Sequence, residues 1–523
     1  MEVFMLLSRL LSESEIEYVS CKRDGTRDMR AVANIEIENI FCDSRQVVEK
    51  GLYVALDGLH TDSHGFVGEA ASHGALAAVV SRRAFDEGRV ETGEKCIILI
   101  CVEDCRDAMA RIYAAFYGNP QRWMTFVGVT GTNGKTTVSR MIYEILSRAG
   151  NKCGLIGTVG TLVSGEDGDQ ALGEDLAKSK NPLANMTTPD PAELYRALRA
   201  MRECGVRYVI MEVTSHALSF KKVAPIEFEV GVFTNLTEDH LDFHRDMEGY
   251  YLAKRSLFEK CRKCVINVDD KYGRRLSGEV MIQKFTCSCE GRAAYYNACD
   301  VRLHGEKGIE YRLASGRMRL RIRSKIPGGI TVINTLEAAA VCDILGISSC
   351  EIKDSIASLD GIRGRLEKLK LDERVGFSVY VDYAHTPDAL ENLLRTAKSI
   401  SKRGQRIVLL FGCGGDREKQ KRALMGKIAS EMADFFIVTS DNSRSENTSD
   451  IINDIVSGIG SDGHYTVIED REKAIEYAIW NSRDGDILLL AGKGHEEYQI
   501  DKNGKRNFSE RQIVNKYVKK YHG

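Results

Sequence analysis

The sequence predicts an α/β protein of three domains, and three observations support this prediction. The chain has 523 residues, which at roughly 100 to 200 residues per domain exceeds a single hydrophobic core. Short apolar runs typical of strands alternate with runs typical of helices along most of the chain. Several apolar runs lead directly into polar motifs, and in open α/β sheets ligands bind at that end of the strands.

The composition is that of an ordinary globular protein. Apolar residues make up 43% of the chain and the net charge is -2, so neither a nucleic-acid partner nor a membrane surface is indicated. The 15 cysteines lack zinc-ligand spacing and are more typical of a reducing compartment than of a disulfide framework. No apolar run approaches a membrane span, and the start of the chain lacks the basic segment of a signal peptide. We therefore expect a cytoplasmic protein.

The first predicted domain covers residues 1–121. It alternates strand-like runs such as Gly51–Leu56 with helical runs of small residues such as Gly68–Ala78. A further helix is expected over Arg106–Tyr117 and stops at Gly118-Asn-Pro120, a strong helix breaker that marks the boundary.

The second predicted domain covers residues 122–364 and alternates strands with helices, which predicts a mostly parallel sheet covered on both faces. From Val280 to Pro327 alternating β-type residues predict an antiparallel addition, and a helix is expected over Asn334–Leu345. The strand candidates are Thr125–Val129, Cys153–Ile156, Tyr208–Met211, Val230–Thr234 and Cys264–Val268.

The third predicted domain covers residues 365–523. Each of its four strand candidates runs into a polar motif, so the motifs should share one site along a sheet edge. The strands are Phe377–Val381, Arg406–Phe411, Asp434–Thr439 and Asp486–Leu490; the motifs that follow begin at Asp382, Gly412, Ser440 and Gly492.

A phosphate loop stands between the strand at residues 125–129 and a helix from Thr137. Glycines in Thr130-Gly-Thr-Asn-Gly-Lys-Thr-Thr137 let backbone N–H groups converge on phosphate oxygens, Lys135 neutralises charge and Thr136 can ligate magnesium. The strict pattern would have glycine at Val129. We expect ATP and Mg²⁺ as ligands, with the nucleotide held by Gly131, Thr132, Asn133, Gly134, Lys135, Thr136 and Thr137.

Carboxylate and imidazole side chains follow two neighbouring strand candidates. Glu212 ends one strand and is a candidate magnesium ligand, because magnesium prefers hard oxygen ligands. Asp239 and His240 follow another, where a metal or phosphate role and an ordinary loop role are both open. A kinase, a GTPase-like switch and an ATP-driven ligase all remain possible on these residues, although the Asn-Lys-x-Asp motif of GTPases is absent.

Across almost its whole length the chain resembles the Mur ligase family. The matching motifs include Asp43-Ser-Arg45, the phosphate loop, Thr187-Thr-Pro189, Glu212-Val-Thr-Ser-His216, Tyr251 to Phe258, Gly364-Arg365 and Asp382 to Pro387. The resemblance implies an N-terminal UDP-binding domain, a central P-loop ATPase-like domain and a C-terminal Rossmann-like domain. It also implies ligation through an acyl phosphate: ATP phosphorylates a carboxylate, and an amine then displaces the phosphate.

The resemblance assigns roles to particular residues. Lys135, Glu212, His240, Lys254 and Arg365 would be catalytic, with Thr136, Glu212, His240 and a carbamylated Lys254 as metal ligands, and Asn334 and Asp382 as further nucleotide contacts. The nucleotide sugar would be held by Ser44, His60, Thr187, Thr188, Thr214 and Lys222. Thr214 and Lys222 stand where many relatives have serine and arginine, and Phe220 stands where some have glutamine.

The incoming amino acid should be bound by third-domain motifs, at Arg417, Asp441, Asn442, Ser443, Arg444, Gly492 and Glu496. Meso-diaminopimelate differs from lysine by a distal carboxylate, for which the guanidinium fork of Arg444 is suited. Ser443 departs from the proline that diaminopimelate-adding members show. The expected reaction joins meso-diaminopimelate to the D-glutamate γ-carboxyl of UDP-N-acetylmuramoyl-L-alanyl-D-glutamate in peptidoglycan synthesis.

Alternatives remain at this level. They are a lysine-adding ligase, a folylpolyglutamate synthetase-like ligase and a catalytically silent ATP-binding scaffold. An arginine paired with Glu446 would be the plain structural reading of Arg444. A monomer is expected.

Overall fold

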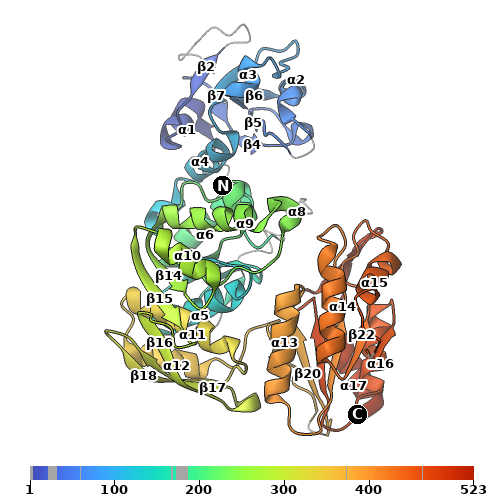
Figure 1. Cartoon of the computed structure of the whole chain (residues 1–523). Helices are drawn as coiled ribbons and strands as arrows, with labels where there is room; N and C mark the ends of the chain where they lie inside the picture. Colours follow the sequence, from blue (N-terminus) through green and yellow to red (C-terminus); the bar gives the residue numbers. More distant parts are fainter. Residues whose placement is uncertain are drawn as a thin grey trace. The chain divides into compact units, whose positions relative to one another are not determined.

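The computed structural model describes residues 4–21, 32–58, 61–165, 169–171, 186–372, 374–461 and 463–522 (Figure 1). Its helices and strands alternate and its larger sheets are mostly parallel, so the predicted α/β class is confirmed. The chain forms two compact units, one of residues 1–128 with 151–229 and one of residues 129–150 with 230–523. The boundaries of the three predicted domains stay a prediction.

The N-terminal part contains a five-stranded sheet of order β2-β7-β6-β5-β4, parallel from β4 to β7 with β2 antiparallel at one edge. Its elements are β1 (Met5–Leu6), α1 (Leu7–Glu13), β2 (Val19–Cys21), β3 (Glu36–Ile37), β4 (Asn39–Phe41), β5 (Gly51–Val54), α2 (Val67–Ser72), β6 (Ala75–Ser81), α3 (Arg82–Asp86), β7 (Ile98–Val102) and α4 (Cys105–Phe116).

The helix predicted over Gly68–Ala78 is too long. Helix α2 ends at Ser72, and from Ala75 the chain is the central strand β6, paired with both β5 and β7. Alanine favours helices, but tertiary pairing and burial on both faces outweigh that local preference here.

The middle of the chain contains an eleven-stranded sheet of order β11-β10-β9-β12-β8-β13-β14-β15-β16-β17-β18. Its strands are β8 (Thr125–Thr130), β9 (Cys153–Gly157), β10 (Gly160–Val163), β11 (Gln170–Ala171), β12 (Tyr208–Glu212), β13 (Phe228–Phe233), β14 (Cys261–Asn267), β15 (Gln283–Ser288), β16 (Tyr296–Leu303), β17 (Ile309–Ala314) and β18 (Arg319–Ser324). Its helices are α5 (Lys135–Arg148), α6 (Pro191–Glu203), α7 (Ser215–Ser219), α8 (Leu241–His244), α9 (Met247–Arg255), α10 (Lys271–Glu279), α11 (Ile330–Ile344) and α12 (Ser349–Ser358).

The antiparallel addition predicted from Val280 is correct only in part. Strand β15 pairs parallel with both β14 and β16, whereas β16, β17 and β18 form the antiparallel meander. The expected helix from Asn334 begins earlier, at Ile330, and as α11 it is buried along most of its length.

The C-terminal part contains a six-stranded sheet of order β19-β20-β24-β21-β22-β23, parallel except for β19. Its strands are β19 (Glu367–Lys368), β20 (Ser378–Asp382), β21 (Ile407–Phe411), β22 (Phe435–Val438), β23 (Tyr465–Val467) and β24 (Ile487–Ala491), and a separate hairpin is formed by β25 (Tyr498–Asp501) and β26 (Gly504–Asn507). Its helices are α13 (Pro387–Ile400), α14 (Gln420–Met432), α15 (Thr448–Val456), α16 (Arg471–Trp480) and α17 (Glu510–His522).

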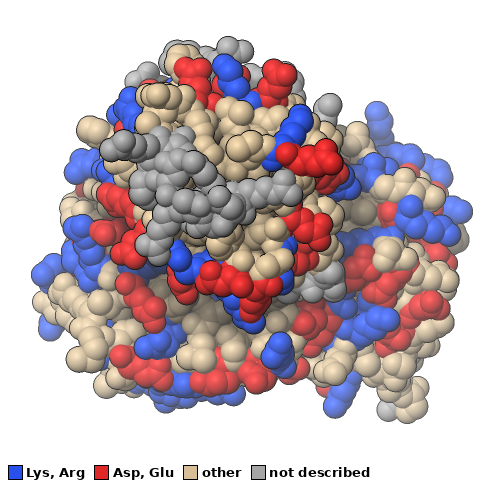
Figure 2. All heavy atoms as spheres, turned by 90° about the horizontal axis from the view of Figure 1, so that it is seen from above, with Lys and Arg blue, Asp and Glu red and all other residues tan. Residues whose placement is uncertain are grey.

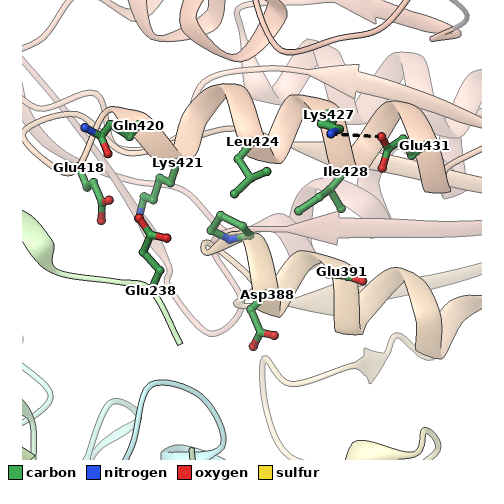
Figure 3. A pocket seen from close by; sticks show the side chains of 11 residues that line it. Glu238, Asp388, Glu391, Glu418, Gln420, Lys421, Leu424, Lys427, Ile428 and Glu431 are labelled. Carbon is green, nitrogen blue, oxygen red and sulfur yellow. Dashed lines mark ion pairs between the residues drawn. The ribbon is translucent and has the colours of Figure 1, made fainter. Parts of the chain in front are cut away.

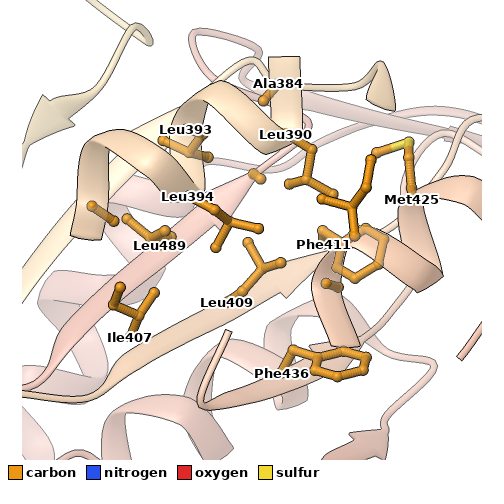
Figure 4. Packing of buried hydrophobic residues seen from close by; sticks show 14 of the residues in the cluster. Ala384, Leu390, Leu393, Leu394, Ile407, Leu409, Phe411, Met425, Phe436 and Leu489 are labelled. Atoms are coloured by element: carbon orange, nitrogen blue, oxygen red, sulfur yellow. The ribbon is translucent and has the colours of Figure 1, made fainter. Parts of the chain in front are cut away.

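Two buried clusters hold this C-terminal sheet between its helices. On one face Leu390 and Leu394 of α13 and Met425 of α14 pack against Leu409 and Phe411 of β21 (Figure 4). On the other face, side chains of α16 and α17 pack against the same strands. The four predicted strands β20, β24, β21 and β22 are neighbours, so their carboxyl ends and the polar motifs lie along one sheet edge.

Charge on the surface is mixed. On the face shown in Figure 2, basic and acidic side chains are interspersed and neither sign dominates. Among the described residues, no helix is long and apolar enough to cross a membrane.

Glu337 of α11 is an acidic side chain enclosed in the core. It is fully buried, and among the described residues neither carboxylate oxygen has a hydrogen-bond partner. Burial, and then the negative charge of Asp269, raise its pKa well above the usual value. The folded protein therefore keeps a proton that the unfolded chain has released, and stability decreases as pH rises above the ordinary carboxyl pKa.

We expect Glu337→Gln to lose less stability than the wild-type protein as the pH is raised. The Glu337 carboxyl lowers the free energy of unfolding by at most about 1.4 kcal/mol for each pH unit of increase, and the glutamine amide, which does not titrate, has no such effect. The measurement is the thermal midpoint at pH 6, 7 and 8, with Glu94→Gln at an exposed position as the matched control. Equal pH dependence of wild type and Glu337→Gln would contradict the expectation.

Candidate active site

The phosphate loop connects β8 to α5, as predicted from the sequence. Gly131 and Gly134 have φ values of +150° and +87°, in the region that side chains disfavour. A Cβ on Gly131 would lie 2.0 Å from Thr234 Oγ1, so no larger residue fits this turn. The Lys135 ammonium donates to the carbonyl oxygens of Gly131 and Thr132, at 3.0 and 2.8 Å.

The segment after β13 supports this loop from one side. Thr234 Oγ1 donates to Asn133 O at 2.6 Å, and Asn133 N donates to Asn235 Oδ1 at 2.9 Å. Thr132 Oγ1 donates to Thr237 O at 3.1 Å. These bonds fix the loop backbone, which leaves its N–H groups preorganised for phosphate oxygens.

Two C-terminal residues contact the same loop. Arg365 Nη2 donates to the hydroxyl of Thr136 at 2.8 Å, and Asn133 Nδ2 donates to Asp388 Oδ2 at 2.6 Å. The Arg365 guanidinium lies 4.8 Å from the ring centroid of Tyr383. The predicted catalytic residues Lys135 and Arg365 thus lie at the same loop as Thr136, a predicted nucleotide contact and metal ligand.

Lys254 of α9 points to the loop from within the protein. Its side chain is 1% exposed, and its Nζ donates to Gly131 O at 2.8 Å and lies 4.6 Å from the Tyr250 ring centroid. Burial, and then the positive charge of Lys135, lower its pKa well below the usual value, while Asp239 acts in the opposite direction. Burial therefore favours the neutral form of this amine.

His240 lies beside an acidic partner. Its Nε2 is 3.4 Å from Asp239 Oδ2, and its backbone has a left-handed φ of +58°. Burial raises the pKa of Asp239, but His240 and further cations outweigh burial, so the net shift is downward. Asp239 is therefore an ionised carboxylate, and it stands next to His240 in the segment that the sequence analysis singled out.

Glu212, at the end of β12, is also buried. Its two carboxylate oxygens accept from Thr158 N and Thr158 Oγ1, both at 2.9 Å. A Cβ on Gly157 would lie 2.2 Å from Glu212 Oε1. The position of the Glu212 carboxylate therefore depends on the last residue of β9 being glycine.

Four of the residues predicted to hold the nucleotide sugar cluster around Glu212. Thr187 Oγ1 is 3.1 Å from Thr158 Oγ1, and Thr188 Oγ1 is 2.8 Å from Glu212 O and 3.3 Å from Thr214 Oγ1. Lys222 Nζ donates to Thr188 O at 3.3 Å and pairs with Asp190 at 2.7 Å.

The two remaining sugar-site predictions are in the N-terminal part. Ser44 is buried in a short 3₁₀ turn, where its hydroxyl donates to Glu69 at 2.5 Å. His60 lies outside the described residues.

The predicted further nucleotide contacts differ in their surroundings. Asn334 Oδ1 lies 3.1 Å from the position that a Cβ on Gly134 would take, so Asn334 borders the phosphate loop. Asp382 accepts backbone N–H groups at both oxygens, from Leu366 at 2.6 Å and Ala384 at 2.7 Å. Those bonds hold the segment next to Arg365, and burial raises the pKa of Asp382.

The predicted amino-acid contacts form a second cluster at the carboxyl ends of β22 and β24. Asn442 Nδ2 donates to Glu496 Oε2 at 2.9 Å, and a Cβ on Gly492 would lie 2.6 Å from Asp441 Oδ2. Ser443 is buried next to them. The nearby positive charge of Arg444, after burial, lowers the pKa of Arg417.

Arg444 has no carboxylate partner among the described residues. Its φ is +53°, and its Nη1 donates to the carbonyl oxygens of Gly415 at 2.6 Å and Asn442 at 3.4 Å. Glu446 instead pairs with Arg422 at 2.8 Å and accepts from Asp416 N. The structural reading of Arg444 as a partner of Glu446 is therefore wrong.

Sequence reasoning missed the buried cations behind this cluster. Lys493 donates to Asn442 and Glu496. Arg471 donates to the carbonyl oxygens of Ser440 and Ala491. Arg422 donates to the carbonyl oxygen of Gly414 and to the carboxylate of Glu446. Lys493 stands inside the Gly-Lys-Gly-His-Glu motif, and this motif is the sequence signal from which Lys493 could have been predicted. The two arginines lie in helices, where no local pattern marks them.

A cavity of about 350 Å³ lies beside these elements, and none of the predicted site residues lines it (Figure 3). Its lining combines apolar and charged side chains, and one of them, Asp388, accepts a hydrogen bond from Asn133 of the phosphate loop. The lining residues are Glu238, Pro387, Asp388, Glu391, Glu418, Gln420, Lys421, Leu424, Lys427, Ile428 and Glu431.

A glycine-rich phosphate loop with a charged site at the strand ends of a following domain is the arrangement of an ATP-driven ligase. Residues 129–342 match the model of the Mur ligase middle domain, and residues 364–494 match that of the Mur ligase glutamate ligase domain. The chain belongs to the Mur ligase family.

Proteins similar to this chain within that family include diaminopimelate ligases. UDP-N-acetylmuramoyl-L-alanyl-D-glutamate–2,6-diaminopimelate ligase 1 of Clostridium acetobutylicum is 39% identical over 93% of this chain and 95% of that protein. The Clostridium tetani enzyme of that name is 40% identical over 92% of this chain and 95% of its own length. A solved structure of a ligase with this name has a TM-score of 0.63 at 28% identity, covering 95% of this chain and 98% of that one.

One more distant structure shares the fold. E. coli FolC in complex with DHPP and ADP has a TM-score of 0.58 at 20% identity, and the match covers 74% of this chain and 90% of that one. Its shorter match leaves part of this chain without a counterpart.

Proposed function

We propose that the chain joins meso-diaminopimelate to the D-glutamate γ-carboxyl of UDP-N-acetylmuramoyl-L-alanyl-D-glutamate with cleavage of ATP to ADP and phosphate. The observation that carries the choice of amino acid is Arg444, a guanidinium at the strand ends with no carboxylate partner in the described residues. A distal carboxylate supplies that partner. The names of the relatives support the same substrate.

Different residues bind the ATP phosphates and neutralise charge while the carboxylate is activated. Lys135 and the N–H groups of the loop bind the ATP phosphates, and Arg365, which contacts Thr136, neutralises charge that develops during phosphoryl transfer. The γ-carboxylate attacks the γ-phosphorus and the bond to ADP breaks. The amine of the incoming amino acid then attacks the acyl carbon, and phosphate leaves with its electron pair as the amide forms.

We propose Mg²⁺ as the metal of this site, held by Thr136, Glu212, His240 and a carbamate on Lys254. Three of the four donors fit directly, because hydroxyl, carboxylate and carbamate oxygens are hard ligands, and His240 would add one imidazole nitrogen. The carbamate forms when the neutral Lys254 amine attacks carbon dioxide and loses a proton, for which the burial of this amine is suited. When bound, Mg²⁺ supplies charge neutralisation for the phosphate oxygens.

Phosphate release tests the proposed reaction. Purified protein is given ATP, Mg²⁺ and the nucleotide dipeptide, with diaminopimelate, with lysine or with no amino acid. We expect release that requires diaminopimelate. Release without any amino acid would refute ligation, and preference for lysine would refute only the choice of amino acid.

Arg444→Ala should raise the KM for diaminopimelate about 30-fold while the KM for ATP stays unchanged. The reason is the loss of one charge-assisted contact worth about 2 kcal/mol. Steady-state kinetics measure both constants, and Arg403→Ala, at an exposed position in the same part of the chain, is the control. An unchanged KM for diaminopimelate would remove Arg444 from the site.

A further inference from the structure

Lys493 lies at the centre of the polar cluster at the carboxyl ends of β22 and β24. Its side chain is 0% exposed, and its Nζ donates to Asn442 Oδ1 and to Glu496 Oε2, both at 3.2 Å. A buried ammonium without compensating partners would be strongly disfavoured, and these two contacts supply partners for Lys493.

The ammonium dictates how the Asn442 amide is turned. An ammonium only donates, so Asn442 Oδ1 must face it, and Oδ1 also accepts from Ile500 N at 3.0 Å. The amide nitrogen therefore points the other way, where one N–H donates to Glu496 Oε2 at 2.9 Å. In the described residues the second N–H has no partner, which leaves a donor for a ligand oxygen.

The ammonium also holds Glu496 in place. Glu496 Oε2 accepts from both Lys493 and Asn442, and Oε1 accepts from the hydroxyl of Tyr498 at 3.3 Å. A carboxylate offers about four acceptor positions, so Glu496 keeps capacity for a ligand ammonium.

Four charged side chains at these two strand ends sum to zero, and Arg417, which follows β21, adds one positive charge to the cluster. Asp441 and Glu496 carry negative charge, and Lys493 and Arg444 carry positive charge. Burial raises the pKa of Asp441, but Lys493 and then Arg471 oppose it and the net shift is downward, so Asp441 is ionised. Arg471 itself is neutralised by Glu510, at 2.8 Å.

We infer that Lys493 is a positioning residue that makes this cluster select a zwitterionic distal group over a purely cationic one. The inference rests on the proposed function. The distal end of diaminopimelate carries one ammonium and one carboxylate, which matches a cluster that offers an anionic contact at Glu496 and a cationic contact at Arg444. The distal end of lysine carries an ammonium alone, and removing the charge of Lys493 makes the cluster one unit more negative, which favours that ammonium.

The test compares Lys493→Met, which removes the charge, with Lys493→Gln, which removes the charge but keeps an N–H donor. Lys493→Arg retains the charge, and Lys398→Met, at an exposed position on α13, is the matched control. For each protein kcat and KM are measured separately with diaminopimelate and with lysine, together with the KM for ATP and the thermal midpoint.

We expect the ratio of kcat/KM for diaminopimelate to that for lysine to decrease at least tenfold in both Lys493→Met and Lys493→Gln. The change should lie mainly in KM, the KM for ATP should stay unchanged, and Lys493→Arg should recover part of the ratio. Because Lys493→Gln loses only the charge, it keeps the test valid if Lys493→Met folds poorly.

A merely structural lysine would lower activity with both amino acids equally and leave the ratio unchanged, which would overturn the inference. A ratio that changes in Lys493→Met but not in Lys493→Gln would also overturn it, because the lost N–H donor and not the charge would then be responsible. Failure of the wild-type protein to use diaminopimelate at all would refute the proposed function instead.

Discussion

Lys254→Met should lower kcat about a thousandfold while the protein remains folded. The buried Lys254 amine donates to Gly131 O and has no carboxylate partner among the described residues. It contributes little to stability, because burial disfavours its charged form. Methionine fills nearly the same volume, so we expect an equal or higher thermal midpoint. The loss of activity follows from losing the carbamate oxygens near the phosphates, at the scale typical of removing one electrostatic partner of a reacting group.

Two measurements separate the carbamate from other roles of Lys254. Phosphate release gives kcat, with Lys307→Met, at an exposed position, as the control. Carbon-13 NMR of the protein in labelled bicarbonate should show a carbamate resonance in the wild type and in Lys307→Met, and none in Lys254→Met. Full activity of Lys254→Met, or no carbamate signal in an active wild-type protein, would contradict the proposed modification.

The phosphate loop was predictable because its determinants are local. A strand, two glycines with positive φ and a helix beginning at Lys135 follow one another within a few residues, and each has its own sequence signal. The strand-end motifs were predictable for a related reason, since parallel strands bring their carboxyl ends to one edge whatever their spacing in the sequence.

The parts that escaped prediction depend on contacts distant in sequence. Residues Ala75 to Ser81 form a strand because β5 and β7 flank them, which local alanine content cannot reveal. Arg471 and Lys493 tie strand ends together through hydrogen bonds to residues 20 or more positions away. Asp382 stays a predicted nucleotide contact, and both its oxygens accept backbone N–H groups in the structure.

Gly157→Ala should lower activity about 100-fold without a comparable loss of stability. Its new Cβ would lie 2.2 Å from Glu212 Oε1, and the carboxylate, as the free end of a flexible side chain, would rotate away and lose its bonds to Thr158. If Glu212 is a magnesium ligand, the Mg²⁺ concentration for half-maximal activity should rise as well. The loss of contacts that support a metal ligand lowers metal affinity about 10- to 100-fold.

Gly154→Ala is the matched control on the same strand. Its Cβ would lie 2.6 Å from the Met201 sulfur, which is also the flexible part of a side chain, so the steric cost is similar while Glu212 is not touched. Adding Glu212→Gln to Gly157→Ala should reduce activity little further, since both changes remove the same carboxylate contact. Additive losses in the double variant, or equal losses in Gly154→Ala and Gly157→Ala, would show that crowding of β9 and not displacement of Glu212 limits the reaction.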